Sequence, residues 1–177
     1  RGVRRAADRS EAAGRGGDEF ARNGRLVLRA GFAQTRSELG ETRAHDESAG
    51  VDLASLGLAG QCQLDQFAAR TIRDLPADLI SLKLGINVVN ADSMRERAFV
   101  PAVHGLLDTI RDGHPDAPIV VISPIICPAA EDHPGPTLPS VDGRFDVVER
   151  PDELAVGALS LERIRELLAI AVAQRRA

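Results

Sequence analysis

The chain has 177 residues, a formal net charge of −4 and 44% hydrophobic residues, a composition typical of one globular domain with a buried core. The lack of a basic excess argues against nucleic-acid binding, and five Phe with no Trp or Tyr argue against stacking on bases. No stretch reaches the ~18 apolar residues of a membrane span. Residues 1–20 lack the apolar centre of a signal peptide, so we expect a cytoplasmic protein.

The N-terminal part has little apolar content. Residues 1–24 are rich in Arg, Gly, Asp and Glu, and we expect them to be disordered or poorly folded because they cannot offset the entropy of ordering. Residues 25–31 could form a short strand, and residues 32–50 are polar with weak helical character. We therefore expect one domain over residues 25–177, with its clearest pattern over residues 51–128.

A regular pattern begins at residue 51. The stretch "VDLASLG", residues 51–57, predicts a strand that ends in glycine. Residues 64–75 predict a helix with Asp65 in its first turn, where the helix dipole favours an acid, and Pro76 ends it. We expect its inward face to comprise Leu64, Phe67, Ala68, Ile72 and Leu75.

The next strand and helix follow the same alternation. Residues 78–84 are nearly all apolar, which suits a parallel strand covered on both faces. Ser93 and Glu96 have the spacing of a capping box at the start of a helix, and Pro101 predicts a kink or a later start. Gly113 is the expected C-cap. The predicted apolar stripe consists of Phe99, Val103, Leu106, Leu107 and Ile110.

The C-terminal third completes the pattern. Residues 118–124 predict a strand, residues 127–143 a loop rich in Pro and Gly, and residues 161–176 a helix capped by Ser160. Strands that alternate with helices predict an α/β fold with an open parallel sheet. The inward residues of the last helix are expected to be Leu161, Ile164, Leu168 and Ala171.

Three glycines and an asparagine follow the predicted strands. Gly57, Gly60, Gly85 and Asn87 fall at the carboxyl ends of strands, where open α/β sheets bind their ligands. A glycine N–H can approach a ligand closely, and an asparagine amide donates a hydrogen bond without carrying a charge. Aimed at one point, the two groups would form an oxyanion hole. A plainer alternative is that Gly85 and Asn87 only form a turn.

A long run of the sequence resembles a known enzyme family. From "DLASLGLAGQCQLD" through "RTIRDLPADLISLKLGINVVN" to "DTIRDGHPDAPIVVISPIICP", the chain is similar to the GDSL-like branch of the SGNH hydrolases, which are esterases and acyl hydrolases. The resemblance covers residues 51–176. It implies a flavodoxin-like three-layer α/β/α fold with a parallel sheet, incomplete at the C-terminus. It also implies hydrolysis of a small-molecule carboxylic ester with no cofactor and no metal.

Two of the four family blocks have a match. By resemblance, "LAGQC" gives Gly60 as the backbone donor of the oxyanion hole, and "LGINV" gives Asn87 as the side-chain donor. Gly85 and Gly57 would support the turns. Val88 stands where many members carry Asp, which weakens the support of that loop.

The other two blocks have no match. The family's serine follows the first strand, but no serine ends residues 25–31, and Ser37 is the nearest one. The family's histidine belongs to an Asp-x-x-His-Pro motif near the C-terminus, and this chain ends before it. We hypothesise that the chain derives from an SGNH esterase, that it is truncated at the C-terminus, and that its residues 1–50 are translated in a shifted reading frame. We expect the enzymatic activity of this chain alone to be weak or absent.

Two histidines imitate the missing motif. His114 lies in "DGHP" before a strand, which is the wrong edge of the sheet, so we expect it to serve in a turn and C-cap. His133 lies in "EDHP" after a strand, on the correct edge. His104 and His45 show no partner in the sequence.

Three alternatives remain open. The first is an inactive remnant of the same fold that binds a small acyl ligand. The second is a Rossmann-like nucleotide site at "GLAG", which lacks the full glycine motif. The third is thiol chemistry at Cys62, which needs a basic neighbour; we expect Cys62 and Cys127 to be small buried hydrophobes instead. The sequence leaves the oligomeric state open.

Overall fold

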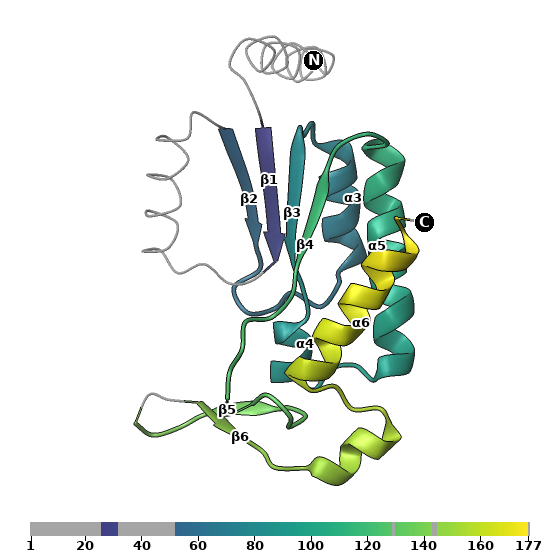
Figure 1. Ribbon diagram of the computed structural model, residues 1–177. Helices are drawn as coiled ribbons and strands as arrows, with labels where there is room; N and C mark the ends of the chain where they lie inside the picture. Colours follow the sequence, from purple (N-terminus) through teal and green to yellow (C-terminus); the bar gives the residue numbers. More distant parts are fainter. Residues whose placement is uncertain (1–25, 32–51, 129, 143–144, 177) are drawn as a thin grey trace, which may run out of the picture.

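A four-stranded parallel sheet organises the molecule. The structure is a computed structural model that describes residues 26–31, 52–128, 130–142 and 145–176. The strands lie in the order β2-β1-β3-β4 (Figure 1). Their bounds are Leu26–Gly31 for β1, Asp52–Gly57 for β2, Leu79–Lys83 for β3 and Ile119–Ile122 for β4.

The first strand occupies the middle of the sheet. In β1, Val27 is opposite Leu53 of β2 on one side and opposite Leu79 of β3 on the other, and all pairings are parallel. Ile80 and Leu82 of β3 are buried. The prediction of a short strand over residues 25–31 is therefore confirmed, and its position brings the loops after β2 and β3 to the same edge.

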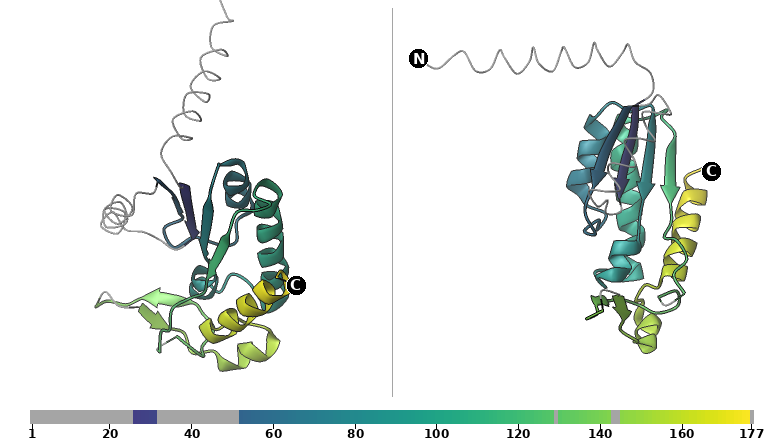
Figure 2. Two further views of the ribbon diagram at one scale, coloured as in Figure 1. Left: turned by 45° about the horizontal axis from the view of Figure 1, so that its top comes forward. Right: turned by 90° about the vertical axis from the view of Figure 1, so that its left-hand side faces the viewer.

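The helices cover the sheet. They are α3 (Gln66–Asp74), α5 (Glu96–Gly113) and α6 (Leu161–Gln174). Figure 2, right, shows α3 on one side of the strands and α6 on the other. The five predicted stripe residues of α5 are all buried, as are the four predicted inward residues of α6. The prediction of an α/β fold with a parallel sheet is confirmed in this general form.

The start of α5 differs from the sequence prediction. The helix begins at Glu96 with Arg95 as its N-cap, no side chain caps it, and Pro101 lies within it. The predicted capping box of Ser93 and Glu96 is wrong, because the Ser93 hydroxyl bonds to the side chain of Gln63 instead. At the other end Gly113 is the last helical residue, and His114 is the C-cap.

The start of α3 also differs. Asp65 is its N-cap rather than a first-turn residue, and Leu64 precedes the helix with a positive φ of 60°. Phe67 is 59% exposed, while Ala69 is buried beside Ile72. Of the five predicted inward residues, Leu64 and Ile72 are buried and only Phe67 is exposed, so the prediction is wrong at Phe67 and missed Ala69.

The predicted loop over residues 127–143 contains a strand. β5 (Thr137–Pro139) pairs antiparallel with β6 (Phe145–Val147), and the 3-10 helix η1 (Pro151–Val156) follows. Strands of three residues are too short to give a readable alternation of apolar and polar residues. The sequence therefore did not show this hairpin.

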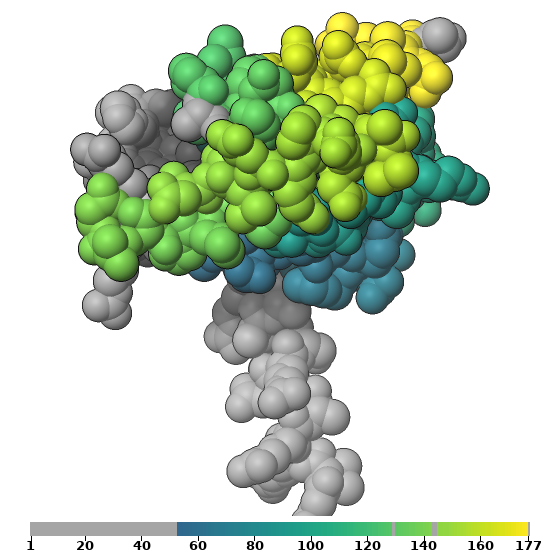
Figure 3. Space-filling view, turned by 90° about the horizontal axis from the view of Figure 1, so that it is seen from below, coloured from purple at the N-terminus to yellow at the C-terminus, as the bar shows by residue number. Residues whose placement is uncertain are grey.

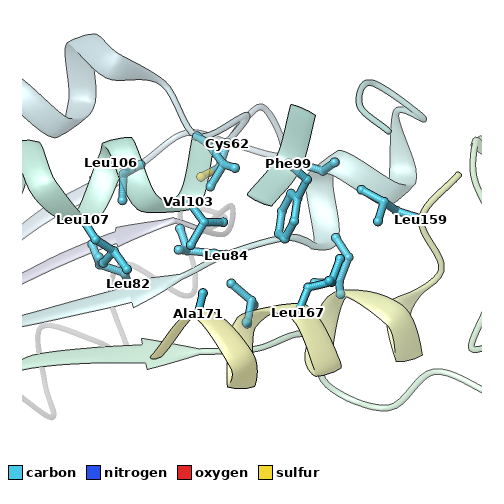
Figure 4. Close-up of a cluster of buried hydrophobic side chains, with 14 of the residues drawn as sticks. Cys62, Leu82, Leu84, Phe99, Val103, Leu106, Leu107, Leu159, Leu167 and Ala171 are labelled. Atoms are coloured by element: carbon cyan, nitrogen blue, oxygen red, sulfur yellow. The ribbon is translucent and has the colours of Figure 1, made fainter. Parts of the chain in front are cut away.

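One hydrophobic core joins the sheet to the helices. Figure 4 shows Leu82 beside Leu107 of α5 and Leu84 beside Val103, with Ala171 of α6 nearby. Burial of each large apolar side chain contributes about 1.5–3 kcal/mol. Cys62 belongs to this core, as predicted, but Cys127 is exposed and that prediction is wrong.

Some predictions fall outside this description. Those on residues 1–24 and 32–50 concern residues outside the described ranges, and Ser37 and His45 are among these. Among the helices of the described ranges, none combines the length and apolar character needed to cross a bilayer.

Candidate functional site

The predicted site residues lie at the carboxyl ends of the strands. Gly57 ends β2 opposite Gly31 of β1, and the turn with Gly60 follows β2. Gly85 and Asn87 follow β3. The arrows of β1, β2, β3 and β4 in Figure 1 point toward this edge, where α4 (Ile86–Asn90) also lies.

Gly85 turns the chain from β3 into α4. It is the N-cap of α4 with φ 102°, and its carbonyl oxygen accepts from the N–H groups of Val88 and Val89 at 3.1 and 3.2 Å. A methyl group on residue 85 would overlap Cγ2 of Ile164 in α6. Only glycine satisfies both the left-handed backbone and the crowding.

Asn87 is buried, and its side chain has a fixed orientation. The side-chain oxygen Oδ1 accepts a hydrogen bond from the Cys62 N–H at 3.2 Å, and the residue is 3% exposed. Because a backbone N–H can only donate, the atom that faces it must be the oxygen. The Nδ2 group, which can only donate, points elsewhere and has no acceptor among the described residues.

Gly60 lies in a tight turn. The N–H of Gln61 donates to the carbonyl oxygen of Leu58 at 2.8 Å, and the two residues between them have positive φ, 46° at Ala59 and 83° at Gly60. A side chain at residue 60 would meet nothing within 4 Å, so the backbone conformation rather than crowding requires glycine. Gly60 is two residues from Cys62, which holds Asn87.

A second link joins the same two segments. The side chain of Gln63 donates from Nε2 to the backbone carbonyl oxygen of Asn87 at 3.1 Å. Its own N–H donates to Oδ2 of Asp65 at 2.9 Å. The turn after β2 is therefore attached to α4 at two successive residues, Cys62 and Gln63.

Val88 takes a hydrophobic role in this arrangement. It is 1% exposed and belongs to the core. The helix α4 presents Asn87 toward the turn after β2 and Val88 toward the core. Apolar packing of Val88 therefore supports the loop at the position where, by the resemblance stated above, many SGNH hydrolases carry Asp.

His114 has the structural role that the sequence predicted. It lies in the turn before β4, is 7% exposed and bonds through Nε2 to the carbonyl oxygen of Ile72 at 2.8 Å. Because a carbonyl only accepts, Nε2 carries the proton. Arg111 also holds this turn, by donating to the carbonyl oxygen of His114 at 2.7 Å.

The other two described histidines lie elsewhere. His104 has a partner that the sequence did not reveal, since Arg175 of α6 lies 3.2 Å from its Nδ1. His133 lies after β4, with Nε2 3.7 Å from Oδ1 of Asp132, which is beyond hydrogen-bond distance. Its Nδ1 is buried and has no partner among the described residues.

The thiol alternative finds no support in the environment of Cys62. The side chain is buried, and this burial raises the pKa of the thiol, so the reactive thiolate is disfavoured. The backbone of this residue holds Asn87, and its sulfur packs in the core. Cys62 therefore contributes to the site through its N–H group.

Residues 130–142 and 145–157 pass beneath α4. Arg150 donates to the side chain of Asp92 and to the carbonyl oxygen of Gly135, and Arg95 pairs with Glu153 at 3.0 Å. A methyl group on Gly135 would overlap the carbonyl oxygen of Val89. Seen from below, Figure 3 shows this segment extending across the edge where the candidate site lies.

Sequence reasoning singled out Gly60 and Asn87 but missed the groups that connect their two segments. Cys62 was considered only for its sulfur, and Gln63 was not considered. The one available signal was their position directly after Gly60 in "LAGQCQ". Among the described residues, no cluster of three or more His, Cys, Asp or Glu could hold a metal ion.

The chain was compared with known proteins. No protein-family model matches it, and the search of curated proteins finds no match either. Among solved structures, it is similar to a salicylyl-acyltransferase, SsfX3, from a tetracycline biosynthetic pathway, with a TM-score of 0.61 and 26% identity. The match covers 86% of this chain and 39% of that one, so the chain spans about two fifths of its neighbour's length. This similarity supports the α/β fold.

Proposed function

We propose that the chain belongs to an acyl-transfer enzyme of the SGNH/GDSL-like type that hydrolyses carboxylic esters. The observation that carries this proposal is the arrangement of Asn87: its oxygen is held by the N–H of Cys62, two residues after Gly60, which leaves Nδ2 as a donor for a ligand. Two such donors stabilise the negative oxygen that forms when an ester carbonyl is attacked, and one of them can contribute about 2.7–4 kcal/mol.

The fold supports the same proposal. The strand order β2-β1-β3-β4 agrees with the first four positions of the flavodoxin-like order 2-1-3-4-5. In that order the direction of the connections reverses between β1 and β3, and ligands bind at this point. The flavodoxin-like three-layer arrangement is thus part of the proposal, with Asn87 following β3 at the reversal.

The similar salicylyl-acyltransferase favours a second candidate within the same chemistry. Hydrolysis and acyl transfer pass through the same tetrahedral oxyanion and differ in whether water or another nucleophile accepts the acyl group. The present chain could therefore transfer an acyl group to an acceptor alcohol. Its oxyanion donors would have the same role in both reactions.

Two assays test the proposal on the full chain. If the chain carries its own nucleophile, a fluorophosphonate probe should label one serine stoichiometrically, and mass spectrometry of the labelled peptide then identifies that serine. p-Nitrophenyl butyrate should be hydrolysed, and an added alcohol should yield a new ester if the second candidate is right. If the probe labels no serine and the ester is not hydrolysed, the proposed catalysis is overturned. That result would favour an inactive acyl-binding protein of the same fold.

A further inference from the structure

The two proposed oxyanion donors come from segments that no shared strand holds together. Gly60 follows β2 and Asn87 lies in α4 after β3, and β1 separates these strands in the sheet. Strands two positions apart are about 10 Å from each other. The loops must therefore converge beyond the strand ends, and their separation there depends on side-chain contacts.

Gln63 makes the side-chain contact between these segments. Nε2 donates to the carbonyl oxygen of Asn87 at 3.1 Å, while Oε1 accepts from the hydroxyl of Ser93. A carbonyl oxygen only accepts, so the amide orientation of Gln63 is fixed by its partner. Both ends of this amide are used, and both bind residues that follow β3.

Ser93 supports this contact from the far side of α4. Its N–H donates to the carbonyl oxygen of Val88 at 3.1 Å, which ties it to the helix that carries Asn87. The hydroxyl is free for Gln63 because Arg95, not Ser93, is the N-cap of α5. The Ser93 hydroxyl thus binds Gln63 instead of capping α5, which explains why the predicted capping box does not form.

We propose that Gln63 is a positioning residue that sets the distance between the Gly60 N–H and the Asn87 Nδ2 group, with Ser93 as its support. The inference rests on the proposed function and deepens it. Gln63 touches no reacting atom, so it acts through Asn87. A misplacement of ~1 Å in an active site can cost about 10²-fold in rate, so loosening this link should lower kcat.

The test compares Gln63→Ala with Gln66→Ala. Gln66 is a matched control, because it is a nearby exposed glutamine whose side chain, among the described residues, donates only to the carbonyl oxygen of Leu64. Gln63→Ala should lower kcat about ten-fold or more and leave KM nearly unchanged, and Gln66→Ala should change neither. Equal kcat values for the two variants would overturn the inference.

Gln63→Glu adds a pH readout that a purely structural role would not give. The carboxylate can still accept from Ser93 but cannot donate to the carbonyl oxygen of Asn87, so kcat should fall as in Gln63→Ala. Protonation at acid pH restores a donor, and kcat relative to the parent should then rise as the pH falls. A constant ratio across the pH range would count against the proposed bond.

A measurement without substrate keeps the positioning role separate from the enzymatic one. Loss of the Gln63 link should speed hydrogen exchange at the Cys62 N–H, which donates to Asn87, but not at the N–H of Ile164 in α6. Unchanged exchange at Cys62 overturns the inference. If Asn87→Asp retains full kcat, the oxyanion function itself fails. If Asn87→Asp loses activity and Gln63→Ala does not, only the positioning role fails.

Discussion

Two buried polar residues at opposite edges of the sheet have different hydrogen-bonding environments. Asn87, 3% exposed, lies at the carboxyl ends of the strands, and His114, 7% exposed, lies in the turn before β4. The ring of His114 donates to the carbonyl oxygen of Ile72, and Arg111 holds its backbone. Asn87 accepts through Oδ1, and its Nδ2 group has no acceptor among the described residues.

The difference separates a structural polar residue from a candidate functional one. A buried donor without a partner costs about 1–3 kcal/mol, so folding alone favours residues that use their hydrogen-bonding groups within the protein. His114 fits this expectation. Among the described residues Asn87 uses only Oδ1, which suits a residue whose Nδ2 group serves a ligand, and four predictions examine the two edges of the sheet.

The largest effect is expected for Asn87→Asp. The carboxylate keeps an acceptor for the Cys62 N–H but removes the Nδ2 donor, so the fold should persist while kcat falls by about 10²–10³-fold. KM should change little, because the lost interaction belongs to the transition state. Steady-state kinetics with p-nitrophenyl butyrate measure both. A rise in KM alone would remove Asn87 from the oxyanion hole.

The next effect concerns stability at the opposite edge. Gly113 lies against α3, where a methyl group would overlap the carbonyl oxygen of Arg73. Gly113→Ala should lower the free energy of unfolding by about 2–3 kcal/mol, because backbone atoms must move apart. Gly105→Ala is the matched control, since that helical position is open. Denaturant unfolding of both variants gives the comparison, and equal losses would contradict it.

A smaller loss is expected for His114→Ala. The carbonyl of Ile72 loses its closer donor and keeps the N–H of Leu75 at 3.3 Å, so the free energy of unfolding should fall by about 1–2 kcal/mol while kcat stays unchanged. His114→Gln offers a side-chain N–H to the same carbonyl and should recover part of the loss. A fall in kcat with unchanged stability would give His114 a role in the reaction and contradict its assignment as a structural residue, in contrast to Asn87.

The smallest effect belongs to a surface ion pair. Arg163 donates to Glu96 at 2.8 and 2.9 Å and lowers the pKa of that carboxyl group. Because the pKa of Glu96 is lower in the folded state, the pair adds to the free energy of unfolding at pH values above the unfolded-state pKa of about 4.3. This contribution is lost as the pH falls through the lower, folded-state pKa. The pair is partly exposed, so this contribution should stay below about 1 kcal/mol.

Unfolding free energies between about pH 6 and about pH 3 measure this contribution. Arg163→Gln should flatten the acid part of the profile, and Glu166→Gln, which removes only the other partner of Arg163, should not. If the two variants gave the same profile, the Glu96 pair would not account for the acid dependence.

Local sequence signals predicted the helix caps correctly where no residue from a distant segment binds the capping side chain. Ser160 caps α6 as predicted, and its Oγ accepts from the Arg163 N–H at 3.2 Å. Ser93 has equally good capping chemistry, but its hydroxyl binds Gln63, thirty positions away in sequence. The spacing of residues within one segment carries no information about such a distant competitor.

The helix α4 shows a second limit. "INVVN" contains β-branched and amide residues that favour helix weakly, and five residues are too few for a periodic pattern. The buried side chains of Val88 and Val89 and the conformation of Gly85 impose this turn of helix. The sequence thus placed Asn87 at the correct edge of the sheet, whereas the partner of its oxygen, Cys62, emerged only from the folded chain.

Gly85 is subject to two constraints of different kinds. Its positive φ belongs to its own backbone, and no second substitution relieves it. The crowding comes from one side chain, Ile164, and a shorter residue there removes it. A smaller residue at position 164 would therefore leave a cavity in the core behind Gly85, while residue 85 must stay glycine. A substitution in α6 thus loosens the packing behind the loop that carries Asn87 without changing any residue of that loop.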